Sequence, residues 1–452
     1  MKKINYFSLA VILLFGLTIQ AQTKKWTLEE CVKYAIDNNI SIKNTELDTK
    51  TADIDKKGAI GNFIPSLNSN ANHSWNIGLN QDPTTGLLRN QTTQYSSFGA
   101  GVGFDIYKGM QNQNTLRRAN LSILAAKYQL TKMQEDVALN VANAFLQVLF
   151  NKENLKVQQE QKANNEKQLA RSEELVKAGS VPRGDLLDIK ATVASDNQRV
   201  INAENALLIS KLSLAQLLQL KEFYDFDVTD DTNVKDENNI LAQTPLAIYD
   251  KAKELRTELK IAKTNLEIAQ KNVAIAKGGF QPTLQGYYNI NTRISYANTF
   301  DFQTQTSKPA DPFSQQFTDN KGQAFGAQLQ IPIFNGWAAK NNVERSKVNL
   351  EKSKIAVEQE ELALQRNVYT AFTDAKGGLN AYESAIISAE AREEAYKYAK
   401  ERYAVGMMNS FDFNQSQTLY TVAQSEVLRT KYDYIFKIKI LEFYFGIPII
   451  KN

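Results

Sequence analysis

The chain has 452 residues, of which 23% are charged, and its formal net charge at pH 7 is only +4. This length leaves room for two or three ordinary domains and for a sizeable core. The small net charge gives no indication of nucleic-acid binding, so no nucleic-acid partner is expected.

The N-terminus has the pattern of a secretory signal peptide. Two lysines precede an apolar run at 7–19, and small residues follow at 20–22. The run is too short to span a membrane as a helix, so 1–22 is predicted to be a signal peptide that is removed on export. No cysteine that could carry a lipid anchor lies beside this cleavage region, and the single cysteine, Cys31, is expected to be a small buried hydrophobe. No later apolar run approaches 18 residues, so any membrane span must be formed by strands.

Residues 66–80, SLNSNANHSWNIGLN, alternate small polar side chains with apolar ones. Neighbouring side chains of a strand point to opposite faces, so this pattern predicts a strand with one apolar and one wet face. Residues 94–107, 283–296 and 324–334 repeat the alternation. Four such strands, tilted, would cross the apolar band of an outer membrane, which is about 25 Å thick. Two soluble hairpins are the alternative, but their wet faces would lack the Lys and Glu that are common on soluble surfaces.

The segments that follow the strands are predicted to be very long helices. Residues 110–178 contain neither glycine nor proline and would extend about 100 Å as one helix. Their counterpart, 337–405, is interrupted only by Gly377-Gly378. Such lengths favour a coiled coil, and apolar residues within 185–221 recur at steps of three and four. The thinly apolar stretch 156–175 fits the wall of a tube or an ordinary coiled-coil hairpin equally well.

The chain contains two copies of one unit. FGAGVGFDIYKG at 98–109 aligns with FGAQLQIPIFNG at 325–336, and the same offset aligns 176–187 with 403–414. Each copy is predicted to contain a helix, two strands, a long helix, a tight turn and a shorter helix. The first copy spans 23–240, with a hairpin at 64–107, a long helix at 110–178 and a helix at 185–221; the second spans 241–452, with the corresponding elements at 281–334, 337–405 and 410–445.

The predicted loops 80–93 and 297–320 are rich in Asn, Thr, Gln and Pro, as expected for turns at the outer ends of hairpins. His73 is the only histidine, and no cluster of Cys or carboxylates that could complete a metal site accompanies it. Its place near Trp75 on the apolar side of the strand predicts a residue at the membrane interface.

Three motifs point to a known family. They are an opening helix, WTLEECVKYAIDNN at 26–39, a strand-to-helix junction, IPIFNG at 331–336, and a hairpin tip with Val405-Gly406 and Asp412. With these motifs in duplicated order, the mature chain resembles the TolC-type outer-membrane factors, the outer membrane efflux protein family, over essentially its full length.

The resemblance implies a mainly α-helical fold with a β-barrel part, built as a homotrimer. The four strands of each chain would join one 12-stranded transmembrane barrel, which would continue as a long coiled-coil tunnel in the periplasm. Strand geometry agrees, because an eight-stranded barrel is filled by side chains whereas twelve strands can leave a water channel. The wet face would then line the pore, and the expected pore-lining residues are Asn68, Asn70, Asn72, Asn76, Asn289 and Asn291.

The resemblance further implies an exit duct in the outer membrane of a Gram-negative bacterium. Such a duct belongs to a tripartite efflux or type I secretion system and passively conducts cargo that an inner-membrane pump and a periplasmic membrane-fusion adaptor deliver. It contacts outer-membrane lipid and needs no cofactor. By position in the family's pattern, the hairpin tips that dock the adaptor contain Gly179, Val405 and Gly406.

The resemblance also places a gate just past the second tip. Asp412 corresponds to a residue of an acidic ring, and Gln415 stands where a second acid often occurs. Asp185 and Tyr403 match latch positions, whereas Met408 replaces a latch arginine, so a closed state would depend on fewer ionic links. Three Asp412 carboxylates around a threefold axis would repel one another and attract cations. The alternative is that Asp412 only stabilises the start of its helix through the helix dipole.

Two other classes of function fit the sequence less well. An enzyme is not expected, because the sequence has no Gly-rich phosphate loop, no nucleophile elbow and no metal-spaced His or Cys set. Asp185 and Asp188 share a helix face, but acids in a first turn usually complement the dipole. The second alternative is a secreted trimeric coiled-coil scaffold or adhesin without a pore, and the strand pairs at matching places in both copies argue against it.

Overall fold

The computed structural model describes residues 25–81, 86–221, 226–229, 239–301, 303–304 and 306–449. The predicted signal peptide, 1–22, lies outside the described residues, and so do parts of both predicted outer loops. The chain divides into two compact units, each of which combines segments from both halves of the sequence. We call Met1–Glu46, Tyr128–Leu259 and Gln359–Asn452 the helical unit, and Leu47–Lys127 and Lys260–Glu358 the sheet unit.

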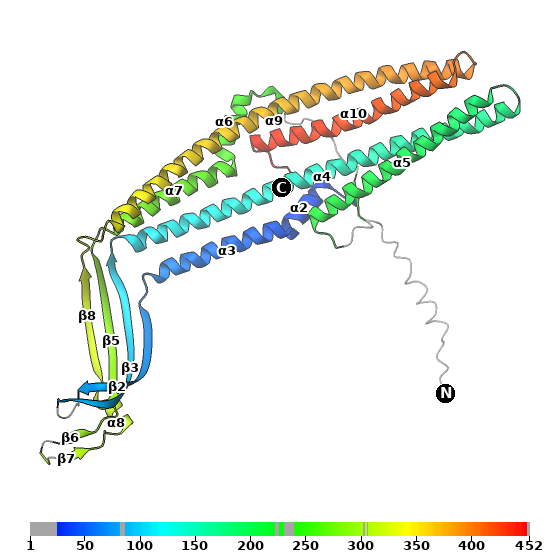
Figure 1. Ribbon diagram of the computed structural model, residues 1–452. Helices are drawn as coiled ribbons and strands as arrows, with labels where there is room; N and C mark the ends of the chain where they lie inside the picture. The colour runs from blue at the N-terminus through cyan, green and yellow to red at the C-terminus, as the bar shows by residue number, and fades with distance from the viewer. Residues whose placement is uncertain are drawn as a thin grey trace, which may run out of the picture. The chain divides into compact units, whose positions relative to one another are not determined.

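The sheet unit contains one antiparallel sheet of four strands in the order β2-β3-β5-β8 (Figure 1). The register places Asn68, Gly101 and Asn289 side by side on one face. Leu67, Val102 and Tyr288 lie on the opposite face, so the predicted alternation of wet and apolar faces is confirmed. Within the chain, β2 and β8 are the two edge strands. The strands are β2 (Ser66–Gln81), β3 (Leu88–Lys108), β5 (Thr283–Ser295) and β8 (Gly322–Gln330).

The last strand is shorter than the alternation at 324–334 predicted. β8 ends at Gln330, two residues before Pro332. Proline has no N–H group to donate to a strand ladder, so the pairing stops although the apolar alternation continues to Ile333.

Both strand-to-helix junctions use the same backbone turn. Gly109 and Met110 have φ values of 58° and 60° before α4 (Gln111–Lys177), and Gly336 and Trp337 have φ values of 61° and 65° before α9 (Ala338–Ala404). Glycine is the only residue that adopts a positive φ without a steric cost. The identical turn at equivalent places follows from the internal duplication.

The predicted outer loop 297–320 contains regular structure that its turn-rich composition concealed. It holds the short strands β6 (Thr299–Asp301) and β7 (Thr306–Lys308) and the helix α8 (Phe313–Asp319), which packs against β5. β5 pairs with β8 only as far as Asn291, so beyond that residue no described strand pairs with the edge of β5 that faces away from β3. Gln316 covers this edge: its side-chain amide accepts a hydrogen bond from Ser295 N and donates one to Ser295 O, both at 2.9 Å. These are the two bonds that an opposing strand residue would form.

Replacing Gln316 with alanine is expected to expose the β5 edge. The loss of the two hydrogen bonds to the Ser295 backbone should cost about 1–3 kcal/mol at this edge. Hydrogen–deuterium exchange measured across 292–296 should therefore be faster in the variant. Gln315→Ala, which removes an exposed neighbour on the same helix, is the control and should leave the exchange unchanged. Equal protection in both variants would show that Gln316 does not cover the edge.

Helices form most of the helical unit (Figure 1). Among the helices that the structure describes, none combines the length and the apolar character needed to cross a membrane. Two further helices, α3 and α7, have residues in both units. Besides segments of α4 and α9, the elements are α2 (Leu28–Asn38), α3 (Ile40–Gly61), α5 (Arg183–Leu218), η1 (Ile240–Ala242), α6 (Pro245–Leu255), α7 (Thr257–Gly278), α10 (Ser410–Phe445) and the parallel strands β1 (Lys25–Trp26) and β4 (Asp227–Val228).

The core of the helical unit gathers apolar side chains from α2, α4 and α5. Phe145 and Leu214 are almost completely buried there. Cys31 has no exposed surface, as predicted, and burial raises the pKa of its thiol to about 12. Thr27 and Glu30 cap α2 through reciprocal hydrogen bonds of 3.1 and 3.2 Å, which fix the helix start against this core.

The second long helix, α9, is continuous through Gly377-Gly378. A Cβ atom at Gly378 would lie 3.2 Å from Lys437 Cδ and 3.4 Å from the Tyr434 Cα atom, both on α10. Because glycine lacks this atom, α10 can pack closely against α9 at this point. Gly378 therefore serves helix packing, and neither glycine breaks the helix.

Candidate pore face and gate

The wet face of the sheet contains all six asparagines predicted to line a pore. Asn68, Asn70, Asn72 and Asn76 follow β2 at every second or fourth position, and Asn289 and Asn291 lie on β5. Glycines make room for their amides: a Cβ at Gly99 would lie 2.8 Å from the Asn70 Oδ1 atom, and one at Gly322 would lie 2.7 Å from the Asn291 Oδ1 atom. The face is therefore tiled with small polar groups.

A hollow of about 640 Å³ lies over this face at the end of the sheet that joins the helices. Its polar lining includes Ser66, Asp105, Gln285, Asn289 and Gln328. Along each strand these residues alternate with residues whose side chains lie on the opposite, apolar face. The wet face can therefore hold water along the strands.

The apolar face contains His73, where it contacts Trp75 edge-on at a ring-centre distance of 4.2 Å. Its Nδ1 atom lies 2.7 Å from the Ser96 Oγ atom, and its Nε2 atom lies 3.0 Å from Gln94 Nε2. Among the described residues, no group of three or more His, Cys, Asp or Glu side chains could hold a metal ion. The polar partners and the neighbouring indole suit an interfacial position.

The two hairpin tips have the same geometry. Gly179 and Gly406 have φ values of 73° and 76°. After each glycine the next N–H group bonds back to the last helical turn: Ser180 N donates to Leu175 O at 2.9 Å, and Met407 N donates to Arg402 O at 2.8 Å. Together with the bonds of the glycine N–H groups, this is the Schellman arrangement that ends a helix. Val405 is 71% exposed beside the second glycine.

Asp412 lies in the first turn of α10, where Asn409 caps the helix. The Asn409 Oδ1 atom accepts a hydrogen bond from Asp412 N at 2.8 Å, and its Nδ2 group donates one to the Asp412 Oδ2 atom at 2.9 Å. The Asp412 carboxylate is exposed and takes part in the helix start. Its exposure leaves one carboxylate edge free to face other copies of the chain while Asn409 holds the helix start.

Of the other predicted gate residues, Asp185 and Tyr403 have specific partners. The Asp185 Oδ1 atom accepts a hydrogen bond from Ser410 Oγ at 3.3 Å, which links the starts of α5 and α10. Tyr403 stacks on the buried ring of Phe413 at a centroid distance of 4.6 Å and an angle of 8°. Gln415 is exposed and, in the described part of the chain, forms no side-chain hydrogen bond.

The sequence analysis did not predict a row of stacked aromatic rings between α9 and α10, the two helices of the second hairpin. Tyr396 and Tyr403 of α9 interleave with Phe413 and Tyr420 of α10 through ring contacts of 4.6 to 5.9 Å. Burial raises the pKa of the Tyr396 and Tyr420 hydroxyls. The signal was present in the sequence, because each pair of aromatic residues is separated by seven positions, the repeat of a coiled coil.

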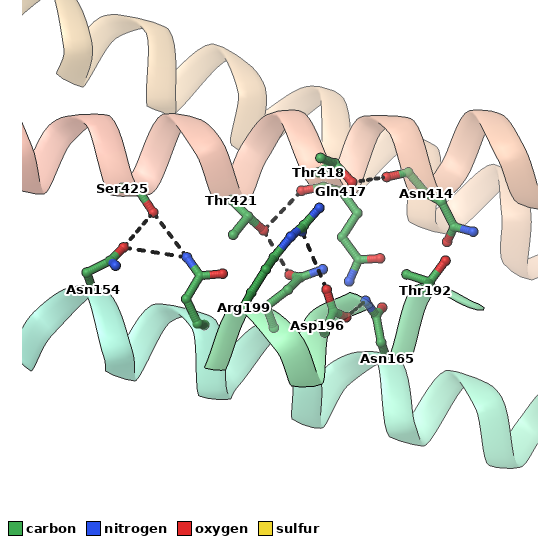
Figure 2. A network of polar contacts seen from close by, with 12 residues as sticks. Asn154, Asn165, Thr192, Asp196, Arg199, Asn414, Gln417, Thr418, Thr421 and Ser425 are labelled. Atoms are coloured by element: carbon green, nitrogen blue, oxygen red, sulfur yellow. Dashed lines mark hydrogen bonds and ion pairs between the residues drawn. The ribbon is translucent and has the colours of Figure 1, made fainter. Parts of the chain in front are cut away.

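A polar seam joins the two helical hairpins of the chain (Figure 2). The Thr421 hydroxyl donates to the Gln161 Oε1 atom at 2.9 Å, and the Ser425 hydroxyl donates to the Asn154 Oδ1 atom at 3.0 Å. These α4 residues lie in the thinly apolar stretch or just before it. The seam between α4 and α10 is thus formed by hydrogen bonds, which the apolar pattern could not reveal.

Next to the seam lies a buried carboxylate. Asp196 of α5 is 2% exposed and accepts a short hydrogen bond from the Asn165 amide, while Arg199 NH1 lies 3.5 Å from its Oδ1 atom (Figure 2). Burial raises the pKa of Asp196 above its usual value, although Asn165 and Arg199 act in the opposite direction. This network ties α5 to α4 within the first hairpin.

Comparison with known proteins shows which family has this architecture. The outer membrane efflux protein family matches residues 32–219 and 248–439. The outer membrane protein TolC of Vibrio cholerae serotype O1 is 24% identical over 384 residues, which cover 83% of this chain and 80% of that protein. The match by family covers both halves and most of the chain.

Solved structures share the fold. A membrane protein from Pseudomonas aeruginosa superposes with a TM-score of 0.78 at 16% identity, covering 92% of this chain and 90% of its own. The Campylobacter jejuni CmeC outer membrane channel gives a TM-score of 0.77 at 18% identity, covering 93% and 85%. The predicted TolC-like fold class is therefore confirmed, and the chain belongs to the outer membrane efflux protein family.

Proposed function

We propose that three copies of the chain form a passive exit duct in the outer membrane of a Gram-negative bacterium. Each copy would contribute four strands to a 12-stranded barrel, with β8 of one copy pairing with β2 of the next. The duct would belong to a tripartite efflux or type I secretion system. An inner-membrane pump and a periplasmic adaptor would deliver the cargo, and the duct itself would catalyse no reaction.

The observation that supports this proposal most strongly is the difference between the two faces of the sheet. Its apolar face exposes large side chains, among them Leu67, Ile77 and Phe325, which are 72%, 83% and 83% exposed in the single chain. Among the described strand residues, the wet face exposes one large hydrophobic side chain, Tyr287, and is otherwise rich in asparagine and glycine. Contact of the first face with lipid and of the second with water explains both compositions.

Free edges at both sides of the sheet support the trimer. A sheet edge leaves backbone donors and acceptors unpaired, which is untenable in lipid unless the sheet closes. Four strands cannot close on themselves, whereas twelve can enclose water. A secreted scaffold without a pore would need neither the exposed apolar face nor open edges of this length.

Membrane fractionation tests the proposal against the scaffold. The proposal predicts that the protein is extracted from outer membranes as a trimer that resists detergent until it is heated. A scaffold would be recovered from the soluble periplasmic or extracellular fraction. Recovery of soluble protein in the absence of detergent would contradict the proposal.

The proposal assigns adaptor docking to the tips of the two helical hairpins and gating to the start of α10, just past the second tip. The exposed tip at Val405 and Gly406, with Gly179 of the first hairpin, would meet the adaptor. Asp412 would contribute to an acidic ring, and Asp185 and Tyr403 would hold the closed state. Their partners within the chain, Ser410 and Phe413, tie these residues to the same helix start.

Replacement of Asp412 tests the ring. Asp412→Ala trimers in planar bilayers are expected to lose cation preference and to be blocked less by multivalent cations, because the repeated negative charge is absent. Trimer stability should fall by no more than about 1 kcal/mol, since Asn409 still caps the helix. Asp412→Asn is the control for the helix start: it keeps a side-chain acceptor for the Asn409 amide but lacks the charge. Unchanged selectivity in both variants would leave only the helix-start role.

A further inference from the structure

Charge on the sheet is sparse and lies entirely on the wet face. The four strands hold four charged side chains, Arg89, Asp105, Lys108 and Arg293. Asp105 and Lys108 form an ion pair of 2.9 Å at the end of the sheet that joins the helices. The charges there cancel. The two arginines lie at the other end, and among the described residues neither forms an ion pair.

Arg293 is presented in a fixed orientation. Its Cζ atom lies 3.9 Å from the centre of the Tyr95 ring, a distance typical of a cation–π stack. Tyr95 pairs with Ser74 and Ser295, and Arg293 pairs with Ser97, so the stack lies on the wet face among small hydroxyl side chains. The Asn320 amide holds the strand at this point by donating to Arg293 O at 2.7 Å. The guanidinium is exposed, with its N–H donors available to solvent.

From this arrangement we infer that Arg293, stacked on Tyr95, is an anion-recognising site at the outer end of the duct. The inference rests on the proposed function, which places the wet face in the lumen of a trimer. Three guanidinium groups would then face one aqueous passage without neighbouring carboxylates from the strands. A planar guanidinium binds carboxylate, sulfonate and phosphate groups through paired N–H donors, so these are the chemical groups the site would recognise.

A ring of arginines also sets ion preference. Fixed positive charge around a pore concentrates anions and excludes cations. The outer end of the duct would therefore favour anions, whereas the proposed Asp412 ring at the inner end would favour cations. Measurements of the outer site should be made in Asp412→Asn trimers, where the inner ring carries no charge.

The test is reversal potential and block in planar bilayers, with full-length trimers carrying Asp412→Asn. Adding Arg293→Gln is expected to lower the chloride-to-potassium permeability ratio by about threefold, because a ring of fixed charge shifts the local potential by the order of kT. It should also raise the concentration of inorganic tripolyphosphate needed for half-block. Ser97→Asp, which sets a carboxylate opposite an intact Arg293, should give the same loss. Arg293→Gln with Ser97→Arg should restore the preference.

Lys321→Gln is the matched control. Lys321 lies at the same end of the sheet, but its Nζ atom is 5.9 Å from the Phe317 ring, which contacts Phe98 on the apolar face. Its loss should leave selectivity and block unchanged. Unaltered permeability and block in both the Arg293→Gln and the Ser97→Asp trimers would overturn the inference while conduction itself remained. Absence of any channel in wild-type trimers would overturn the proposed function, and the inference with it.

Discussion

Val102→Arg is expected to abolish trimer assembly in the outer membrane. Val102 of β3 lies on the apolar face between Leu67 of β2 and Tyr288, which is near the middle of β5. If that face meets lipid, an arginine there should cost about 2–4 kcal/mol in each copy. Three copies would multiply the penalty, so the yield of heat-modifiable trimers on gels should fall nearly to zero.

Asn289→Arg is the matched control for this substitution. Asn289 directly follows Tyr288, the β5 partner of Val102, but its side chain lies on the wet face and lines the hollow. Its trimers should assemble and conduct less current, because the longer side chain narrows a water-filled passage. Gly101 would be a poorer control, since a Cβ there would collide with the Asn289 side chain. Equal assembly defects in the Val102 and Asn289 variants would remove the assignment of the faces.

Gly406→Trp should abolish export while trimers remain intact. Nothing lies within 4 Å of a Cβ built at Gly406, so the indole meets no neighbour in the chain. The backbone has a φ of 76°, and a side chain in this region costs about 1–2 kcal/mol, which is too little to unfold the protein. The indole would instead block the surface that the adaptor is proposed to meet. Export by whole cells and trimer yield should be measured together.

Gly406→Ala separates steric blockade from backbone strain. Alanine carries the same φ penalty as tryptophan but adds only a methyl group. Normal export with alanine and none with tryptophan would support adaptor docking at the tip. If both variants lose export and trimers together, the glycine is only a helix cap. Normal export by Gly406→Trp trimers would count against docking.

Sequence periodicity predicted the regular parts of the fold because it reflects their geometry directly. Alternation by two assigned the faces of Asn70 and Ala71, and the register places them as expected. The absence of glycine and proline predicted α4 as one helix, and α9 is continuous as well. These features depend on local chemistry, which a single sequence records.

The features that were missed depend on contacts between distant segments. Gln316 covers the edge of β5 only because β8 begins late, and nothing in a turn-rich loop reveals that. The polar seam between Gln161 and Thr421 has no apolar pattern to detect. The partners of Asp185 and Tyr403 lie across a hairpin or in the other half of the chain, so the sequence could name these residues without naming Ser410 or Phe413.

Thiol block of single-channel current tests most directly whether the wet face lines a pore. Asn70→Cys and Ala71→Cys place one thiol on each face of β2, and the native Cys31 is buried and should not react. The account predicts that a charged, membrane-impermeant thiol reagent reduces the current of Asn70→Cys trimers in up to three steps. The same reagent should leave Ala71→Cys trimers unaffected. Block of Ala71→Cys trimers without block of Asn70→Cys trimers would contradict the account.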